Sequence, residues 1–247
     1  MVNSESGKIW DENSSWWFEN VANGNFHEYL EIIVPLSKEL FVQKKLILDL
    51  GTGSGILAKR IMGNLATKVV GLDLSLMQLQ KAAENNLGPS YLQSNSAELP
   101  FKSGVFDGVL ASMVLEHVGN LQNTVEEISR VLQPSGLFVA VINHPVFQTP
   151  GSGPVSAHNS DSDEIGWKVG NYLIESSEVE EISDGIYIPY EHRTISTYLN
   201  TFLEHGFQLQ RVLEPAIVDK NKVTGNNQGG RTIPRLLVAI LEKPLFA

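Results

Sequence analysis

The stretch Ile47–Gly55, ILDLGTGSG, joins a short apolar run to three glycines at alternate positions. The apolar run ends in Asp49 and Leu50, and a helical pattern begins at Ile56. This order predicts a buried strand, a tight turn and a helix. Because glycine lacks a Cβ, such a turn lets a ligand lie against the backbone, beside the amide groups of the following helix N-terminus.

A second apolar run also ends in an acid. It is Val69–Leu74, VVGLDL, and it places Asp73 roughly twenty residues after the glycines, where an acid commonly holds ribose hydroxyls. A glycine-rich turn by itself could be an ordinary strand–helix connection. The glycines and the second acid together predict a nucleoside that lies across the first two strands.

The spacing of the glycines narrows the choice of nucleoside. It is G-x-G-x-G, and Ile56 stands where the dinucleotide fingerprint has its third glycine. The Asp49 carboxylate would repel a diphosphate and attract an ammonium group. S-adenosylmethionine carries an ammonium group and an adenosine, so we favour it over the nicotinamide cofactor of an oxidoreductase.

Further motifs follow in order along the chain. They are Asp49–Gly55 (DLGTGSG), Asp73–Ser75 (DLS), Ser96–Phe101 (SAELPF), Phe106–His117 (FDGVLASMVLEH) and Gln133–Leu137 (QPSGL). This set resembles the class I S-adenosylmethionine-dependent methyltransferases, and within them the small-molecule, methyltransferase type 11-like group. Ser96 departs from the pattern, because the family has there an acid that bonds the adenine amino group.

The resemblance implies an α/β fold with a doubly wound, seven-stranded, mostly parallel sheet of Rossmann-like type. It implies S-adenosyl-L-methionine as the cofactor and methyl transfer as the activity. A protein that keeps this fold as a scaffold without turnover is the alternative. The residues expected to bind the cofactor are Asp49, Gly51, Thr52, Gly53, Gly55, Asp73, Leu74, Met77, Ser96, Ala97, Glu98 and Met113.

Composition restricts the partners. The chain has 247 residues, a formal charge of −10 and no cysteine. An acidic chain lacks the basic face that nucleic acid requires, and without cysteine there are neither disulfides nor thiolate metal sites. The sequence shows no signal peptide and no apolar run long enough for a membrane span, which fits a cytoplasmic protein. We expect a monomer or homodimer without a bound metal.

Alternating apolar runs and helical patterns predict the order of elements. Strands are expected near 46–50, 68–73, 90–94, 105–111, 136–142, 207–214 and 235–242, with the last one antiparallel. Helices are expected near 54–63, 75–86, 121–132 and 194–205. The predicted organisation is an N-terminal helical lid (1–42), the cofactor-binding half (43–143), a substrate cap (144–193), and a C-terminal helix with the last two strands (194–247).

The two flanking segments are the least regular. Residues 11–42 look helical, and Pro35 is expected to kink or divide them. Trp16, Trp17 and Phe18 stand together, so one or two of them should lie over the cofactor or acceptor, or else pack against the cap or a dimer partner. The cap follows the fifth strand and is expected to contain one or two β-ribbon pieces, or to be a disordered insertion.

Five residues are candidates for the catalytic site. His144, which ends the fifth strand, is the first choice for a general base, and His117 follows the fourth strand. Tyr190, His192 and Arg193 form a third group, in which Arg193 would suit an acceptor carboxylate. Packing and capping roles are the alternatives for the histidines, and an ion pair with an acid is the alternative for Arg193. The expected acceptor is a small molecule or peptide, methylated at oxygen or nitrogen by in-line transfer.

Overall fold

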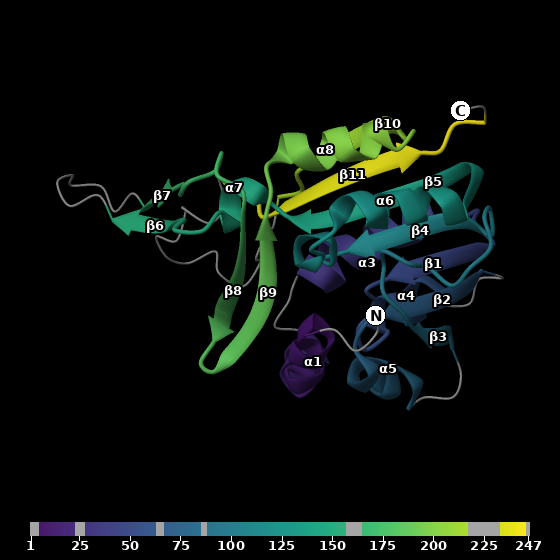
Figure 1. Ribbon diagram of the computed structural model, residues 1–247, viewed down its shortest axis with the longest axis horizontal. Coiled ribbons are helices and arrows are strands. Elements are labelled where there is room, and N and C mark those ends of the chain that lie inside the picture. Colours follow the sequence, from purple (N-terminus) through teal and green to yellow (C-terminus); the bar gives the residue numbers. More distant parts are fainter. Residues whose placement is uncertain are drawn as a thin grey trace.

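The fold is taken from a computed structural model that describes residues 5–22, 28–62, 67–84, 88–156, 165–216 and 233–245. Seven strands form one sheet in the order β10-β11-β5-β4-β1-β2-β3. Their bounds are β1 Leu46–Leu50, β2 Lys68–Asp73, β3 Ser90–Gln93, β4 Phe106–Ser112, β5 Leu132–Asn143, β10 Gln208–Leu213 and β11 Leu236–Glu242. The predicted doubly wound, mostly parallel sheet is confirmed (Figure 1).

The register of the central strands brings the two acid-terminated strands together. β1 pairs with β2 in parallel, with Asp49 opposite Gly71, and with β4 in parallel, with Leu50 opposite Ala111. β11 runs antiparallel to both of its neighbours, as predicted. Because the parallel strands share one direction, their carboxyl ends meet at a single edge of the sheet.

Helices cover both faces of the sheet. On one face lie α3 (Val34–Leu40) and α4 (Ile56–Met62), and on the other lie α6 (Leu121–Val131) and α8 (Ile195–Glu204). Alternate residues of β5 divide between the two cores: Phe138 and Ala140 pack with α6 and α8, whereas Val139 and Val141 pack with α3 and α4. α5 (Leu76–Ala83) follows β2 and contacts β3.

β5 begins four residues earlier than the strand expected near 136–142. β5 begins at Leu132, directly after α6, and its first residues are irregularly paired with β4. Ser135 has a positive φ of 58°, and its N–H donates to Lys243 O at 2.8 Å. The segment before the expected strand is therefore an irregular strand start, held by hydrogen bonds between Ser135, Gly136 and Lys243.

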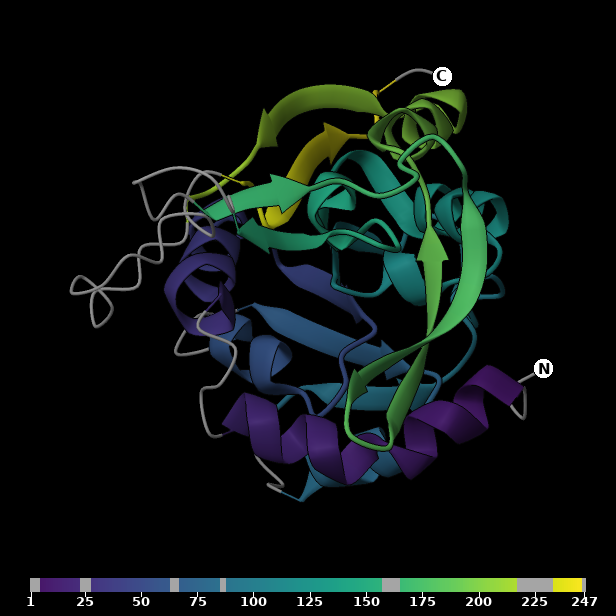
Figure 2. The ribbon, with the colours of Figure 1, turned by 90° about the vertical axis from the view of Figure 1, so that its left-hand side faces the viewer.

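The N-terminal region is helical, as expected, but in separate pieces. α1 (Glu5–Glu12) and α2 (Ser14–Ala22) form an N-terminal helix pair, and the π-helical turn η1 (Tyr29–Ile33) precedes α3. Pro35 lies in the first turn of α3, where the π-helical turn passes into the α-helix. The N-terminal helix pair is seen below the strand ends, against the green hairpin, in Figure 2.

The segment after β5 contains two small antiparallel sheets. After α7 (Pro145–Gln148), β6 (Gly153–Ser156) pairs with β7 (Ile165–Lys168), and β8 (Ser176–Ser183) pairs with β9 (Ile186–His192). These are the expected β-ribbon pieces. The short alternating run at residues 171–174 forms a turn, closed by the bond from Ile174 N–H to Asn171 O at 2.9 Å. The acidic stretch 161–164 lies outside the described residues.

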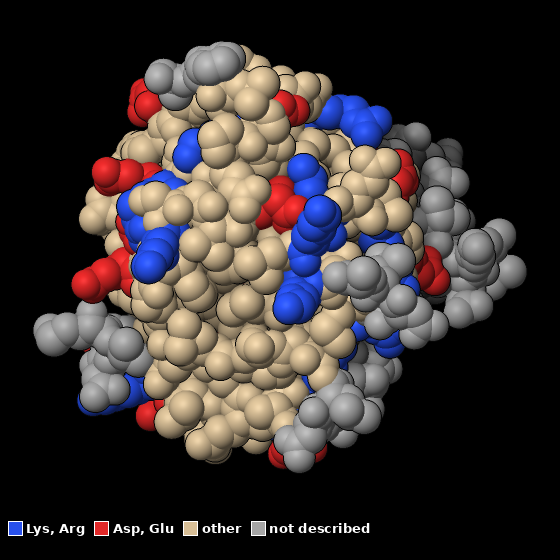
Figure 3. Space-filling view, turned by 90° about the vertical axis from the view of Figure 1, so that its right-hand side faces the viewer, with Lys and Arg blue, Asp and Glu red and all other residues tan. Residues whose placement is uncertain are grey.

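Charged side chains are spread over the surface. On the face seen in Figure 3, basic and acidic side chains occur in small separate groups among uncharged residues. None of the helices in the described part of the chain combines the length and hydropathy that crossing a bilayer requires.

Candidate functional site

A cavity of about 380 Å³ opens at the carboxyl ends of β1, β2 and β4. The strand ends supply its floor, the loop after β3 one side, and the N-terminal helix pair its roof. Several of its wall residues were predicted, namely Asp49, Gly51, Thr52, Gly53, Asp73, Leu74, Ser96, Ala97, Met113 and His117. Others were not, among them Ser6, Trp10, Tyr29, Ser112 and Asn120.

The glycines of the turn after β1 differ in the space beside them: protein atoms occupy it at Gly51, and it is open at Gly53. Gly51 has φ 71°, and a Cβ there would lie 2.5 Å from the Val114 side chain. Gly53 also has positive φ, but a Cβ there would meet only the end of Gln78, at 3.9 Å. The space beside Gly53 therefore belongs to the cavity. Gly55 lies outside the cavity wall, because it packs against Tyr91.

Asp49 ends β1 at the floor of the cavity. Its side chain is buried, and its Oδ2 accepts a hydrogen bond from Thr52 Oγ1 at 2.7 Å. Burial raises the pKa of Asp49 to about 7, and the nearby Asp73 adds to this rise. A cationic ligand group at the floor would favour the ionised form of Asp49.

Asp73 ends β2 and faces the glycine turn. Its Oδ2 accepts from Gly53 N–H at 2.8 Å, and its Oδ1 accepts from Ser75 N–H at 2.9 Å. Enclosure by the surrounding protein raises the pKa of Asp73, and the carboxylate of Asp11 contributes to the rise. Each carboxylate oxygen can accept a second bond, so both remain available to a ligand with two hydroxyl groups.

The loop after β3 forms one side wall with Ser96 and Ala97. Ser96 Oγ lies 3.0 Å from Thr124 Oγ1 of α6, and Ala97 N–H donates to Asn95 Oδ1 at 2.9 Å. Two residues predicted for this region lie elsewhere: Met77 on α5 and Glu98 are both absent from the cavity wall.

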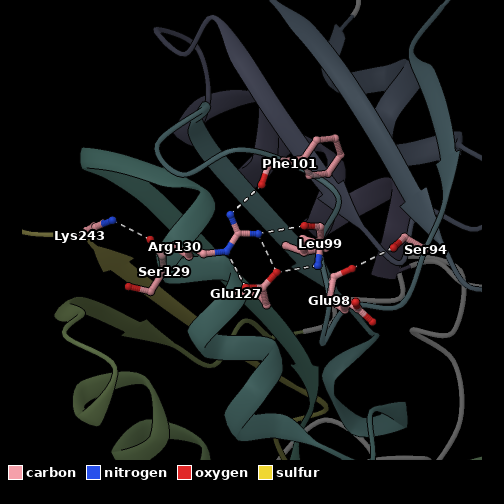
Figure 4. A network of polar contacts seen from close by, with 8 residues as sticks. All are labelled: Ser94, Glu98, Leu99, Phe101, Glu127, Ser129, Arg130 and Lys243. Atoms are coloured by element: carbon pink, nitrogen blue, oxygen red, sulfur yellow. Dashed lines mark hydrogen bonds and ion pairs between the residues drawn. The ribbon is translucent and has the colours of Figure 1, made fainter. Parts of the chain in front are cut away.

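Two charged residues of α6 hold the end of this loop, as Figure 4 shows. Glu127 accepts from Leu99 N–H at 2.6 Å, and Arg130 donates to Leu99 O at 2.9 Å and to Phe101 O at 2.7 Å. Arg130 Nε also pairs with Glu127 at 2.6 Å. The loop is thus fixed through its backbone, which leaves the Ser96 and Ala97 side free to face the cavity.

Two indole rings from the N-terminal helix pair line the cavity. Trp17 lies in the wall, as the aromatic block predicted, and Trp10 lies 5.8 Å from it between ring centroids. The other two members of the block lie outside the wall: Trp16 packs edge-on against Trp17, and the Phe18 ring lies under the Lys81 ammonium at 4.5 Å. The seven-residue spacing of the two tryptophans, which is two helical turns, was the signal for Trp10.

His117 also lines the cavity. Its Nδ1 lies 2.7 Å from Pro189 O, and its ring lies 5.0 Å from the Trp10 ring between centroids. A carbonyl oxygen can only accept, so Nδ1 carries the proton. In the neutral ring Nε2 then has a free lone pair.

Two of the predicted catalytic residues are occupied outside the cavity wall. His144 is buried, its Nδ1 accepts from Val146 N–H at 3.2 Å, and its Nε2 lies 2.9 Å from Glu214. Arg193 donates to Leu115 O at 3.0 Å, and also to the carbonyl groups of the next loop residues, Val118 at 2.6 Å and Gly119 at 3.1 Å. These partners give His144 a helix-capping position and Arg193 a bracing position.

Tyr190 and His192 lie on β9, also outside the wall. Both are buried, and His192 Nε2 lies 2.9 Å from Tyr172 O. The Tyr190 ring packs near the His117 ring, at 6.5 Å between centroids. Tyr190 therefore packs near His117 and does not line the cavity.

Sequence reasoning did not assign a role to Glu116. Its side chain is buried, and its Oε1 accepts two bonds from Asn143, from the backbone N–H and from Nδ2, both at 3.0 Å. Burial raises the pKa of Glu116. This carboxyl ties the loop after β4 to the end of β5. Its place next to His117 in the sequence was the available signal.

The wall residues fit S-adenosylmethionine. The cradle at Gly53 admits a ligand, and Asp49 and Asp73 offer acidic partners for an ammonium group and two hydroxyls. The buried Ser112 Oγ has no hydrogen-bond partner among the described residues. No lysine or arginine of the described chain lines the cavity, so a diphosphate would find no cationic partner there. Nor do the described residues contain a cluster of three side chains suited to a metal ion.

Comparison with known proteins gives the same assignment. The family model for the methyltransferase domain matches residues 48–140. The mitochondrial ubiquinone biosynthesis O-methyltransferase of Rattus norvegicus is 28% identical over 239 residues, which cover 82% of this chain and 69% of that protein. The corresponding enzyme of Bartonella tribocorum is 34% identical over 102 residues, covering 39% of this chain and 41% of that protein.

A solved structure matches over most of the chain. The crystal structure of an S-adenosylmethionine-dependent methyltransferase from Mesorhizobium loti has a TM-score of 0.68 and 25% identity, and covers 81% of this chain and 90% of that chain. The sheet order, the acid-flanked glycine cradle and these similarities agree on one cofactor, S-adenosylmethionine. Residues 48–140 match the methyltransferase domain, and these similarities support a class I S-adenosylmethionine-dependent methyltransferase.

Proposed function

We propose that this methyltransferase acts on an oxygen or nitrogen atom of a small-molecule or peptide acceptor, by in-line displacement. When bound, S-adenosylmethionine supplies the methyl group. The work left to the protein is to hold the acceptor in line, to exclude water and to accept a proton where the acceptor has one to lose. The names of the rat and Bartonella relatives, both O-methyltransferases, support an oxygen acceptor.

The wall residues divide between the parts of the cofactor. In this proposal Asp73 takes the ribose hydroxyls, the turn from Gly51 to Gly53 surrounds the methionine part, and Asp49 faces its ammonium group. Gly55 is left out, because it packs against Tyr91 outside the wall. Leu74 and Ala97 contact the adenine. Met77 and Glu98 are left out, because neither reaches the cavity wall.

The observation that carries the acceptor chemistry is the bond between His117 Nδ1 and Pro189 O. It leaves Nε2 as a proton acceptor on a side chain that lines the cavity, so His117 is the general base in this proposal. His144 is left out because both of its ring nitrogens have partners outside the wall.

The charged residues of the cavity wall favour one class of acceptor over another. An acceptor carboxylate would require a cation, and Arg193 is held by three backbone carbonyl groups. The two indoles offer flat apolar faces, and the described wall offers acids but no lysine or arginine. We therefore favour an uncharged, flat acceptor with a hydroxyl or neutral amine over a carboxylate.

The surrounding segments have matching roles. Residues 1–42 act as a lid, and residues 144–193 act as a cap over the acceptor. Residues 43–143 form the cofactor-binding half, and residues 194–247 complete the sheet. The protein works on its acceptor in the cytoplasm as a monomer or homodimer, without nucleic acid.

The test uses tritiated S-adenosylmethionine with a panel of phenols, amines and carboxylates. Once an acceptor is found, His117→Gln should lower turnover by about a hundredfold or more while cofactor affinity, by calorimetry, stays the same. His205→Gln is the matched control, because His205 Nδ1 also bonds a backbone carbonyl, at 2.8 Å, but lies outside the cavity wall. Unchanged turnover in His117→Gln, or activity on carboxylates alone, would refute the proposal.

A further inference from the structure

The junction between α1 and α2 holds the N-terminal helix pair to the cofactor-binding half. Asp11 Oδ1 accepts from Ser75 Oγ at 2.6 Å and from Met77 N–H at 3.1 Å. Ser75 is itself the N-cap of α5 and accepts from Gln78 N–H at 3.2 Å. Asp11 therefore adds a second cap to α5 from a distant segment, and the positive end of the helix dipole favours its charge.

This contact lies next to the ribose side of the site. Ser75 follows Asp73 by two residues, and its N–H is one of the two backbone groups that orient the Asp73 carboxylate. The same short segment thus connects Asp73, which faces the cavity, with Asp11, which reaches it from the outside.

The junction is also tied on the opposite side. Asn13 Nδ2 donates to Tyr187 O of β9 at 2.8 Å and to Ile9 O at 2.8 Å. Tyr187 O and Pro189 O are two residues apart and point to the same side of β9, away from β8, because proline has no N–H to pair inside a ladder. One edge of β9 therefore holds both the N-terminal helix pair, through Asn13, and His117.

The helices held in this way carry the indole wall. Trp10 directly precedes Asp11, and Trp17 lies in the first turns of α2; both line the cavity. We propose that Asp11 is a latch that retains the cofactor: its contact with Ser75 and Met77 keeps the two tryptophans over the cavity, and the cofactor leaves when this contact opens.

The latch is expected to respond to the cofactor. Without ligand, the carboxylates of Asp11 and Asp73 repel each other across Ser75, and Asp11 contributes to the raised pKa of Asp73. Hydroxyl groups that donate to Asp73 would disperse its charge and lower this repulsion. By linkage, if the bound cofactor favours the contact between Asp11 and Ser75, this contact in turn strengthens cofactor binding. The inference concerns the cofactor alone and does not depend on the acceptor proposed above.

The experiment follows S-adenosylhomocysteine, the demethylated cofactor, by stopped-flow tryptophan fluorescence, since Trp10 and Trp17 lie in the wall. Asp11→Ala should release it about tenfold faster, the size expected for loss of a charged helix cap, with little change in the association rate. Asp11→Asn keeps an acceptor oxygen and loses the charge, so its release should be intermediate. Glu12→Ala is the matched control, because Glu12 is exposed and its substitution removes the same charge one residue away from Asp11.

A second readout does not depend on fluorescence. Hydrogen exchange of residues 5–22 should slow when S-adenosylhomocysteine binds the natural chain, and should slow much less in Asp11→Asn. Release within twofold of the natural chain in both Asp11 variants would overturn the proposal. Equal acceleration in Glu12→Ala would also overturn it, because that result would indicate a general charge effect.

Discussion

Replacing Asp49 by asparagine should stabilise the cofactor-free protein and weaken its hold on the cofactor. The carboxyl is buried, and burial raises its pKa from an ordinary 3.8 to about 7. Between those values the folded chain keeps a proton that the unfolded chain has released, so stability falls as pH rises. The free-energy cost of burying the ionised Asp49 carboxylate is fully present above about pH 7 and absent below about pH 4.

The magnitude follows from the size of the shift. Three units at about 1.4 kcal/mol each amount to roughly 4 kcal/mol at pH 8. Asparagine keeps an oxygen for the 2.7 Å bond from Thr52, but its buried N–H groups lose about 1–3 kcal/mol of hydration. We therefore expect Asp49→Asn to be about 1–3 kcal/mol more stable than the natural chain at pH 8, with the gain lost toward pH 4.

The assay is urea unfolding of the cofactor-free protein across this pH range, with calorimetry of cofactor binding beside it. Asp107→Asn is the control, because Asp107 at the opposite end of the sheet accepts from Lys45 N–H at 2.7 Å and Leu46 N–H at 2.9 Å. An amide cannot accept both bonds, so this variant should lose stability. Below pH 7 the free protein holds a proton on Asp49 that the cofactor must displace, so the natural chain should bind the cofactor up to about tenfold more weakly for each unit that the pH falls, and Asp49→Asn should lack this dependence. A less stable Asp49→Asn at pH 8, or the same pH dependence in both proteins, would refute the reasoning.

Two further predictions concern the packing around Gly51 and the hydrogen bonds of Arg193. Gly51→Ala meets Val114 at 2.5 Å and has positive φ, whereas Gly104→Ala has positive φ with nothing within 4 Å. Urea unfolding should give a loss of about 1–2 kcal/mol for Gly104→Ala and about 2–5 kcal/mol for Gly51→Ala, and equal losses would contradict the packing argument. Arg193→Lys should lower stability by about 2 kcal/mol in thermal unfolding, because one ammonium cannot replace the fork that holds three carbonyl groups. A raised acceptor KM with unchanged stability would return Arg193 to the role of a carboxylate clamp.

The sheet could be predicted from sequence because its signals are local. The central strands β1, β2 and β4 are short apolar runs bounded by glycine or an acid, and the structure has strands at all seven expected places. Local signals also predicted part of the cavity wall, since Asp49 and Asp73 stand at strand ends and Gly53 in the turn that follows β1.

The acceptor side depends on contacts between distant segments, which leave little trace in the sequence. Arg193 was expected either to bind an acceptor carboxylate or to pair with an acid. The structure has the ion pair, with Glu191 at 3.7 Å, together with three backbone carbonyl partners, which any residue type can supply. The sequence put His144 before His117 as general base, but what separates the two is the distant partner of each ring: Glu214 for His144 and Pro189 O for His117. The roles of the individual site residues stay predictions until ligand binding is measured.

The place of β11 has a consequence for how the chain folds. β11 (Leu236–Glu242) lies between β5 and β10, both of which precede it in the sequence. β10 therefore has no route into the sheet until β11 arrives, and until then the edge of β5, with its buried valines and isoleucine, has no partner. Such an unpaired apolar edge is a site of aggregation in a nascent chain. A ribosome that pauses between residues 213 and 236 would hold the protein in that state, so the synthesis rate of this stretch should affect its yield.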